Sequence, residues 1–269
     1  MSANPAKPPV VFVHGLWLHA ESWANWVELF QANGYAASAA SWPGDGPTTE
    51  ATRQNPKALA GYGVTEIAEH IAAQLKPLPA RPILIGHSFG GLLVQNLLGR
   101  DLAAAAIAID PAPIKGVYEL PGSALKASLP ALGNPFNYGQ AIMLTEAQFR
   151  FGFTNALPEA EAHDLYVRYA MPGPARPLFQ VATAMLNPNS ANKVNTANAT
   201  RGPLLLISGE QDNIVPPVLV NSALRIYRKS AAAVTELKSF AGRGHSLALD
   251  SGWRELADDC LGWLKSKGF

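Results

Sequence analysis

One serine in this 269-residue chain stands in a setting that could make it a nucleophile. Ser88 lies in Gly86-His87-Ser88-Phe89-Gly90-Gly91, after an apolar run that predicts a strand (Pro82–Ile85) and before a pattern that predicts a helix (Leu92–Leu98). A sharp turn between strand and helix leaves no room for side chains beside the serine, which explains the glycines. The pattern predicts a catalytic Ser88, and the plainer alternative is an N-capping serine.

A nucleophilic serine needs a base, and the chain has six histidines. With a serine on this kind of turn, the acid and the histidine follow it in sequence. His163 follows but lies in an acidic helical stretch, which indicates a solvated side chain, and His87 is expected to point away from its neighbour Ser88. His245 comes after the last predicted strand, and Gly242 and Gly244 just before it let its loop bend inward. We therefore expect His245 to be the base, with a surface-loop histidine as the alternative.

The base needs a carboxylate that fixes its tautomer and stabilises the imidazolium. Asp212 directly follows the predicted strand Leu204–Ile207, and the next strand along the chain leads to His245. Neighbouring strand ends would bring the two side chains together. Two alternatives stay open, namely Asp110 at the end of the preceding strand and, less favoured, Glu210. Asp212 could also simply cap the following helix.

An oxyanion hole requires two backbone N–H groups aimed at the developing negative charge. Phe89, directly after the serine, would supply one of them. The loop after the first strand, His14-Gly15-Leu16-Trp17, would supply the other, and Gly15 permits an unusual backbone there. We expect the Leu16 N–H to be the second donor, with Trp17 as its alternative.

The elements that must position these residues alternate between strand and helix, which predicts an α/β fold with a doubly wound, mostly parallel sheet covered on both faces. Six strands are expected at Val10–Val13, Tyr35–Ala40, Pro82–Ile85, Ala105–Ile109, Leu204–Ile207 and Val234–Phe240. Helices are expected at Glu21–Gln31, Val64–Leu75, Leu92–Leu98, Val218–Tyr227 and Trp253–Leu264.

Residues 111–198 break this rhythm, because they contain no convincing strand. Three short helices are expected there, at Thr145–Phe151, Pro158–Ala170 and Ala175–Leu186. An insertion of this length between two strands predicts a helical cap on a core made of residues 1–110 and 199–269. Aromatic residues in it could roof a pocket over the serine, so Phe149, Phe153 and, from the core, Trp17 are candidate pocket residues.

Composition narrows the function classes further. Charged residues make up 15% of the chain and the formal net charge is +1, so nothing favours nucleic-acid binding. No apolar run is long enough for a membrane span, and the first nine residues have no secretory signal, which predicts a cytoplasmic protein. The single cysteine, Cys260, is expected to be a buried hydrophobe. No metal or other cofactor is expected, and a homo-oligomer is left open.

Together, His14-Gly15, the Ser88 motif, Gly209-x-x-Asp212 and Gly244-His245 resemble the α/β-hydrolase superfamily over nearly the whole chain. The resemblance implies the doubly wound sheet, a Ser-Asp-His triad and a cap inserted after Asp110. The short N-terminus is similar to the plant methylesterase and hydroxynitrile lyase branch. One position departs from the common Asp-x-Pro-Gly-x-Gly motif, since Ser41 stands where many relatives have the aspartate.

These residues predict a serine hydrolase that cleaves carboxylic esters of small, apolar substrates through an acyl-enzyme intermediate. A lactonase, a thioesterase and a cofactor-free perhydrolase use the same triad and stay open as alternatives. A hydroxynitrile lyase is disfavoured, because Ser246 stands beside the histidine where those enzymes typically have a lysine. A ligand receptor without turnover is the alternative from another class.

Overall fold

The computed structural model describes residues 7–230 and 233–269, so most of the N-terminal stretch examined for a signal lies outside the described residues. Its main sheet has six parallel strands in the order β2-β1-β3-β4-β7-β8. The strands are β1 (Val10–Val13), β2 (Ala37–Ala40), β3 (Ile83–His87), β4 (Ala105–Ile109), β7 (Leu204–Gly209) and β8 (Thr235–Phe240). The strand order reverses its direction beside β1, as the predicted doubly wound fold requires.

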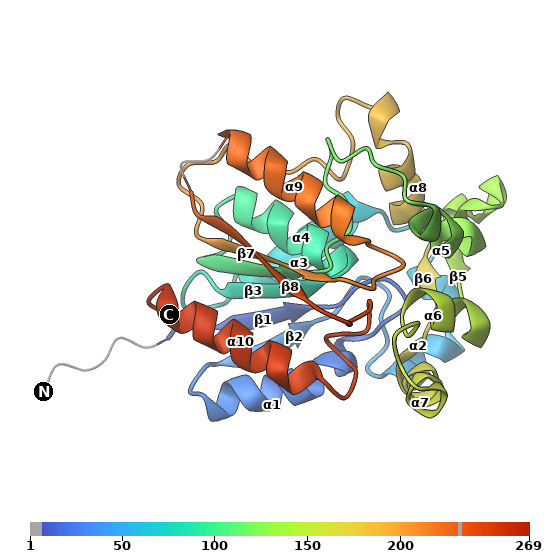
Figure 1. Cartoon of the computed structure of the whole chain (residues 1–269), viewed down its shortest axis with the longest axis horizontal. Helices are drawn as coiled ribbons and strands as arrows, with labels where there is room; N and C mark the ends of the chain where they lie inside the picture. The colour runs from blue at the N-terminus through green and yellow to red at the C-terminus, as the bar shows by residue number, and fades with distance from the viewer. Residues whose placement is uncertain (1–6, 231–232) are drawn as a thin grey trace, which may run out of the picture.

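Helices cover both faces of the sheet, with α1 and α10 on one side and α3, α4 and α9 on the other (Figure 1). Side chains alternate along β1. Val10 and Phe12 pack on the face that α1 and α10 cover, while Val11 and Val13 pack on the face that α3, α4 and α9 cover. The strands β1, β3, β4 and β7 are fully buried and their sequences are mainly apolar, whereas the edge strand β8 is partly exposed and contains polar residues. The helices are α1 (Ala24–Ala32), α3 (Val64–Leu75), α4 (Phe89–Gly99), α9 (Pro217–Ser230) and α10 (Trp253–Ser266).

The predicted core elements are all present, with shifts at their ends. The Glu21–Gln31 helix is in fact a 3-10 turn, η1 (Ala20–Trp23), followed by α1, and α4 starts three residues earlier than its apolar pattern indicated. The sequence pattern missed the helix α2 (Thr49–Gln54) and the 3-10 turn η2 (Pro56–Leu59). Both are too short to show an apolar stripe of helical period, and α2 is also polar.

Residues 111–198 form a group of short elements on one side of the molecule, beside the core (Figure 1). The three expected helices are present, the last of them divided into α8 and η4. Three features were not expected: a helix over Gly122–Leu132 that contains Pro130, the 3-10 turn η3, and a two-stranded antiparallel pair. Strands of two residues give no period that a sequence could show. The elements are α5 (Gly122–Leu132), η3 (Pro135–Gly139), β5 (Ala141–Ile142), α6 (Glu146–Gly152), α7 (Glu159–Tyr169), β6 (Gly173–Pro174), α8 (Arg176–Ala182) and η4 (Ala184–Leu186).

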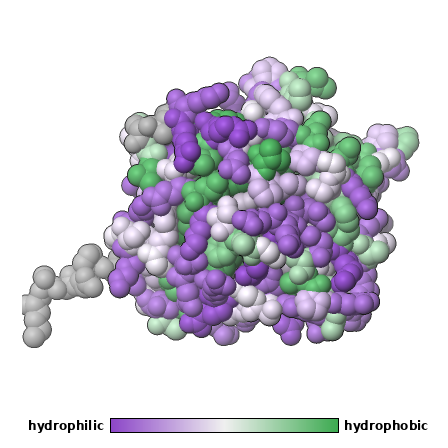
Figure 2. Space-filling model, viewed as in Figure 1, coloured by the Kyte–Doolittle hydropathy of each residue, from purple (hydrophilic) through white to green (hydrophobic). Residues whose placement is uncertain are grey.

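Segment 111–198 contains most of the large exposed hydrophobic side chains of the described residues. Figure 2 shows hydrophobic residues at the upper right, where Figure 1 places part of this segment. The exposed side chains of the segment include Leu120, Leu125, Leu129, Phe136, Met185 and Leu186. No helix of the described residues is long and apolar enough to cross a membrane.

The backbone packs very closely where α4 leaves β3. A Cβ atom on Gly90 would overlap the carbonyl oxygen of Val13, and one on Gly86 would overlap the carbonyl oxygen of Gly90. Helix α4 can therefore lie directly against the ends of β1 and β3 only because these positions are glycine. This contact sets the place of the residue at the start of α4, which is Ser88.

Substitution of Gly90 tests this contact. We expect Gly90→Ala to lower the free energy of unfolding by about 3 kcal/mol, because the new methyl group must displace backbone atoms. Gly262→Ala is the matched control, since Gly262 lies in α10 and its added Cβ meets nothing within 4 Å. That change should stabilise the protein by about 0.5–1 kcal/mol. Urea unfolding measures both, and equal effects of the two substitutions would contradict the packing argument.

Candidate active site

Ser88 occupies a strained backbone position between β3 and α4. Its φ of 55° lies in the left-handed region, which a residue other than glycine or asparagine seldom adopts. The turn is held from both sides, because the Ser88 N–H donates to Ile109 O (2.9 Å) and the Ser88 carbonyl accepts from Ala112 N (2.9 Å). The first N–H groups of α4 have no partner within the helix, so they point toward the space above the serine.

Asp212 and His245 form a fully buried pair. The Nδ1 atom of His245 lies 2.6 Å from Oδ2 of Asp212, and both side chains have no exposed surface. The other carboxylate oxygen, Oδ1, accepts from the N–H groups of Ile214 (2.7 Å) and Val215 (2.8 Å). Asp212 thus caps its own loop and also fixes the imidazole. This bond assigns the proton to Nδ1 and leaves Nε2, which is buried without a hydrogen-bond partner, as a free base.

His87 lies at the same site, which the sequence argument did not anticipate. Its Nε2 contacts the carbonyl oxygen of His245 at 2.8 Å, and the two imidazole rings are 4.6 Å apart. Burial, and then the neighbouring His245, lower the pKa of His87 well below its usual value of 6.5. His87 is therefore neutral and donates from Nε2 to that carbonyl, so it holds the His245 loop in place. Its position next to the serine was the only sequence signal.

Asp110 also reaches this buried cluster. Its side chain has no exposed surface. One of its carboxyl oxygens, one ring nitrogen of His87 and one ring nitrogen of His245 all lie within 4.8 Å of one another. Burial, and then the charge of Asp212, raise the pKa of Asp110 well above its usual value of 3.8. The carboxyl that contacts the imidazole directly is that of Asp212. The third alternative, Glu210, is exposed.

The loop after β1 lies against the serine, as an oxyanion-hole loop must. A Cβ on Gly15 would come 2.7 Å from Cβ and 3.3 Å from Oγ of Ser88, so only glycine fits here. Trp17 follows in a left-handed conformation with φ of 65°. Its indole N–H donates to Ile142 O (3.0 Å) and its carbonyl accepts from Met171 N (3.0 Å). Segment 111–198 therefore holds the backbone of this loop.

A second buried histidine supports the same loop from the core. His14 contacts Asp45 through Nε2 at 3.1 Å and packs on the Trp42 ring at 4.8 Å. Asp45 also accepts from Trp42 N at 2.7 Å. Ser41 takes part through its backbone, which bonds to the Gln74 side chain. Asp45 therefore supplies the carboxylate of this loop, four residues after the position where many relatives have theirs.

The two candidate pocket residues from segment 111–198 differ in what they contact. Phe153 is fully buried, and its ring lies 4.9 Å from the ring of His245 and 6.2 Å from that of Trp17. Phe149 stacks behind it at 4.5 Å and packs on Tyr166. Phe153 is thus in contact with the candidate base, whereas Phe149 supports Phe153.

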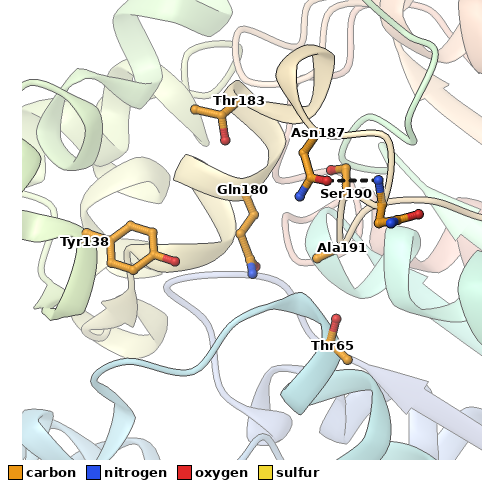
Figure 3. Close-up of a pocket in the computed structure, with 8 residues that line it drawn as sticks. Thr65, Tyr138, Gln180, Thr183, Asn187, Ser190 and Ala191 are labelled. Atoms are coloured by element: carbon orange, nitrogen blue, oxygen red, sulfur yellow. Dashed lines mark hydrogen bonds between the residues drawn. The ribbon is translucent and has the colours of Figure 1, made fainter.

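A polar cavity of about 320 Å³ lies apart from these residues, between α3, η3 and the α8–η4 region. Figure 3 shows the side chains that surround it, with Tyr138 on one side, Thr65 below and Gln180 near the centre. No residue discussed as catalytic lines it. Its lining is Thr65, Tyr138, Gln180, Thr183, Asn187, Asn189, Ser190 and Ala191.

Comparison with known proteins agrees with this architecture. Residues 10–259 match the model of the alpha/beta hydrolase family, and the chain therefore belongs to that family. The family match and the six-stranded sheet confirm the predicted resemblance and fold class.

Solved structures with this fold align over nearly the whole chain. A monoacylglycerol lipase from Paleococcus ferrophilus is 23% identical, with a TM-score of 0.67 and coverage of 97% of this chain and 96% of that chain. Methylesterase MES16 from Arabidopsis is 18% identical, with a TM-score of 0.66 and coverage of 96% and 99%. The pyrethroid hydrolase PytH is 17% identical, with a TM-score of 0.64 and coverage of 97% and 98%. A search of curated proteins found no match.

The buried His87 predicts a specific dependence of stability on pH. Because its pKa is lowered in the folded protein, the unfolded chain binds a proton below about pH 6.5 that the folded protein does not. Its stabilising effect is therefore complete above that pH and is lost on acidification, at up to about 1.4 kcal/mol per pH unit. We expect the free energy of unfolding, measured with urea between pH 7.5 and 5, to change less steeply with pH in His87→Gln than in the wild type. Glutamine keeps a hydrogen-bond donor but does not titrate. Equal slopes in the two proteins would contradict a neutral His87.

Proposed function

We propose that this chain is a serine hydrolase that cleaves carboxylic esters, with Ser88 as nucleophile, His245 as general base and Asp212 as the carboxylate that orients it. The observation that supports this most strongly is the buried contact of 2.6 Å between Asp212 and His245, which leaves His245 Nε2 as a free base in a cluster that also includes Ser88's neighbour His87. The similarity to a lipase, a methylesterase and a pyrethroid hydrolase supports an ester as the substrate class.

In the proposed reaction, His245 Nε2 removes the Ser88 hydroxyl proton as Oγ attacks the ester carbonyl. The carbonyl oxygen becomes negatively charged and accepts from the N–H groups of Leu16 and Phe89. His245 then gives the proton to the leaving alcohol, and an acyl-Ser88 ester remains. Water, deprotonated by His245, hydrolyses that ester and restores the serine. Asp212 stabilises the imidazolium at each step without taking its proton.

A small, apolar acyl or alcohol group is the substrate class that we favour. Phe153 presents an apolar ring beside the candidate base, and Trp17 packs against Phe153. Both side chains are buried, which leaves little polar surface there to bind a charged substrate. Lactones and thioesters would react through the same steps. Kinetics on a matched panel of esters, lactones and thioesters would rank these alternatives. We infer further that residues 111–198 act as the cap that selects the substrate.

Removal of the Ser88 hydroxyl should abolish turnover while the fold is kept. We expect Ser88→Ala to lower kcat on a p-nitrophenyl ester by roughly 10³–10⁶-fold, because no second nucleophile replaces Oγ. The melting temperature should not fall, since alanine removes only the hydroxyl. Residual activity within tenfold of the wild type, in protein free of contaminating esterase, would refute the assignment.

Phe153 and Phe149 form a matched pair for testing substrate selection. Both are fully buried, so Phe153→Leu and Phe149→Leu should lower thermal stability to a similar extent. Only Phe153 contacts the candidate base, so only Phe153→Leu should change the order of kcat/KM along a series of acyl lengths, by up to about tenfold. An unchanged order in Phe153→Leu would assign both rings to packing alone.

A further inference from the structure

Asp110 is built into the site at a cost to the backbone. Its φ of 42° lies in the left-handed region, and its N–H donates to Ile207 O at 2.9 Å. The side chain is fully buried, where Oδ1 accepts from Gly209 N at 2.7 Å and Oδ2 has no conventional donor as a partner. A buried carboxyl oxygen without a donor is costly unless the oxygen itself carries a hydrogen.

The neighbouring carboxylate of Asp212 accounts for where that hydrogen goes. Asp110 and Asp212 are within side-chain hydrogen-bonding reach of each other. Two ionised carboxylates cannot share a buried site, because each offers only acceptors and their charges repel. Asp212 accepts three N–H donors, from Ile214, Val215 and His245, whereas Asp110 accepts one. The carboxylate that accepts more hydrogen bonds is better stabilised in its ionised form, so the proton belongs on Asp110.

We propose that Asp110 is a positioning residue that stays protonated and donates its hydrogen to the Asp212 carboxylate, which holds that carboxylate against His245. The proposal rests on the proposed function, because it assigns Asp110 to the orientation of the same base. No hydrogen bond joins the Asp110 side chain to Ser88 in the described part of the chain, so Asp110 acts through Asp212.

The charged and titratable groups that face Asp110 are consistent with a neutral carboxyl. Asp212 repels a second negative charge, and the neutral His87 offers no positive charge to compensate it. Among the described residues, Arg243 is the cation that opposes this effect, and its guanidinium is already paired with Asp250. A neutral Asp110 leaves the negative charge of the two carboxyls on Asp212.

Two substitutions separate a hydrogen donor from a charge at this position. Asparagine and glycine both tolerate a positive φ, so neither adds backbone strain. Asp110→Asn keeps an acceptor for Gly209 N and a donor for Asp212, and we expect kcat/KM within about threefold of the wild type. Asp110→Gly removes the donor, and we expect a loss of about 10- to 100-fold, typical of a hydrogen bond to a charged group. Asp212→Asn, the reference, should lose about 10⁴-fold.

The dependence of kcat/KM on pH distinguishes a neutral Asp110 from an ionised one, and a purely structural role of Asp110 would not change it. If Asp110 is neutral, Asp110→Asn removes no charge, and the acid limb of kcat/KM should stay in place. If Asp110 were ionised, the same change would remove a negative charge beside the imidazole and move the acid limb down by about 1 pH unit or more. Such a shift, a loss in Asp110→Asn as large as in Asp212→Asn, or full activity in Asp110→Gly would overturn the proposal.

An activity-independent measurement keeps this test separate from that of the proposed function. The infrared difference spectrum of wild type minus Asp110→Asn at pH 7 should contain the carbonyl stretch of a protonated carboxyl, and the inactive Ser88→Ala protein should retain that band. A difference spectrum that contains a carboxylate band and no protonated-carboxyl band would refute the proposal. This holds even if Asp110→Gly fails to fold. Stoichiometric metal in the purified protein would refute it too, because a cation held by His87, Asp110 and His245 would replace the proton.

Discussion

The contact of Gly90 with the Val13 carbonyl is the constraint on which the rest of the site depends. It lets α4 begin directly at the ends of β1 and β3, and the serine at that junction must then adopt a φ of 55°. The strain is sustained because hydrogen bonds from the neighbouring strand β4 and the residues after it hold Ser88 on both sides. The loop after β1 can approach the serine side chain for the same reason, since Gly15 also lacks a Cβ. A parallel sheet that ends all its strands at one edge then brings Asp110, Asp212 and His245 to that junction.

Burial decides the electrostatics of this edge. Asp212, His245, His87 and Asp110 are all buried, so every ring nitrogen and carboxyl oxygen must find a partner or stay neutral. The imidazole of His245 is bonded through one nitrogen only, and the free nitrogen is what general-base chemistry requires. The segment over residues 111–198 contributes to this burial through Phe153, and it holds the loop after β1 through its bonds to Trp17.

The sequence was sufficient to predict what local patterns and chain order determine. Six segments with strand-like patterns, four of them apolar runs, predicted six strands. The order of serine, aspartate and histidine selected the three side chains that the sheet edge can bring together. The roles of these residues stay predictions, as do the limits of the cap. The sequence offered Asp110 only as an alternative to Asp212 and indicated that His87 points away from Ser88. It could not show that both side chains join the cluster, because this depends on the directions of side chains at two neighbouring strand ends. Nor could it show that Asp45 pairs with His14, since that contact spans a loop without regular period.

The central claim is that Ser88 reacts covalently with an acyl-like electrophile while His245 removes its proton. Mass spectrometry after treatment with a fluorophosphonate measures this most directly. The account predicts one adduct per chain, located on the peptide that contains Ser88, and much slower labelling of that peptide in His245→Ala. An adduct on another serine, or equally fast labelling of Ser88 in His245→Ala, would contradict it.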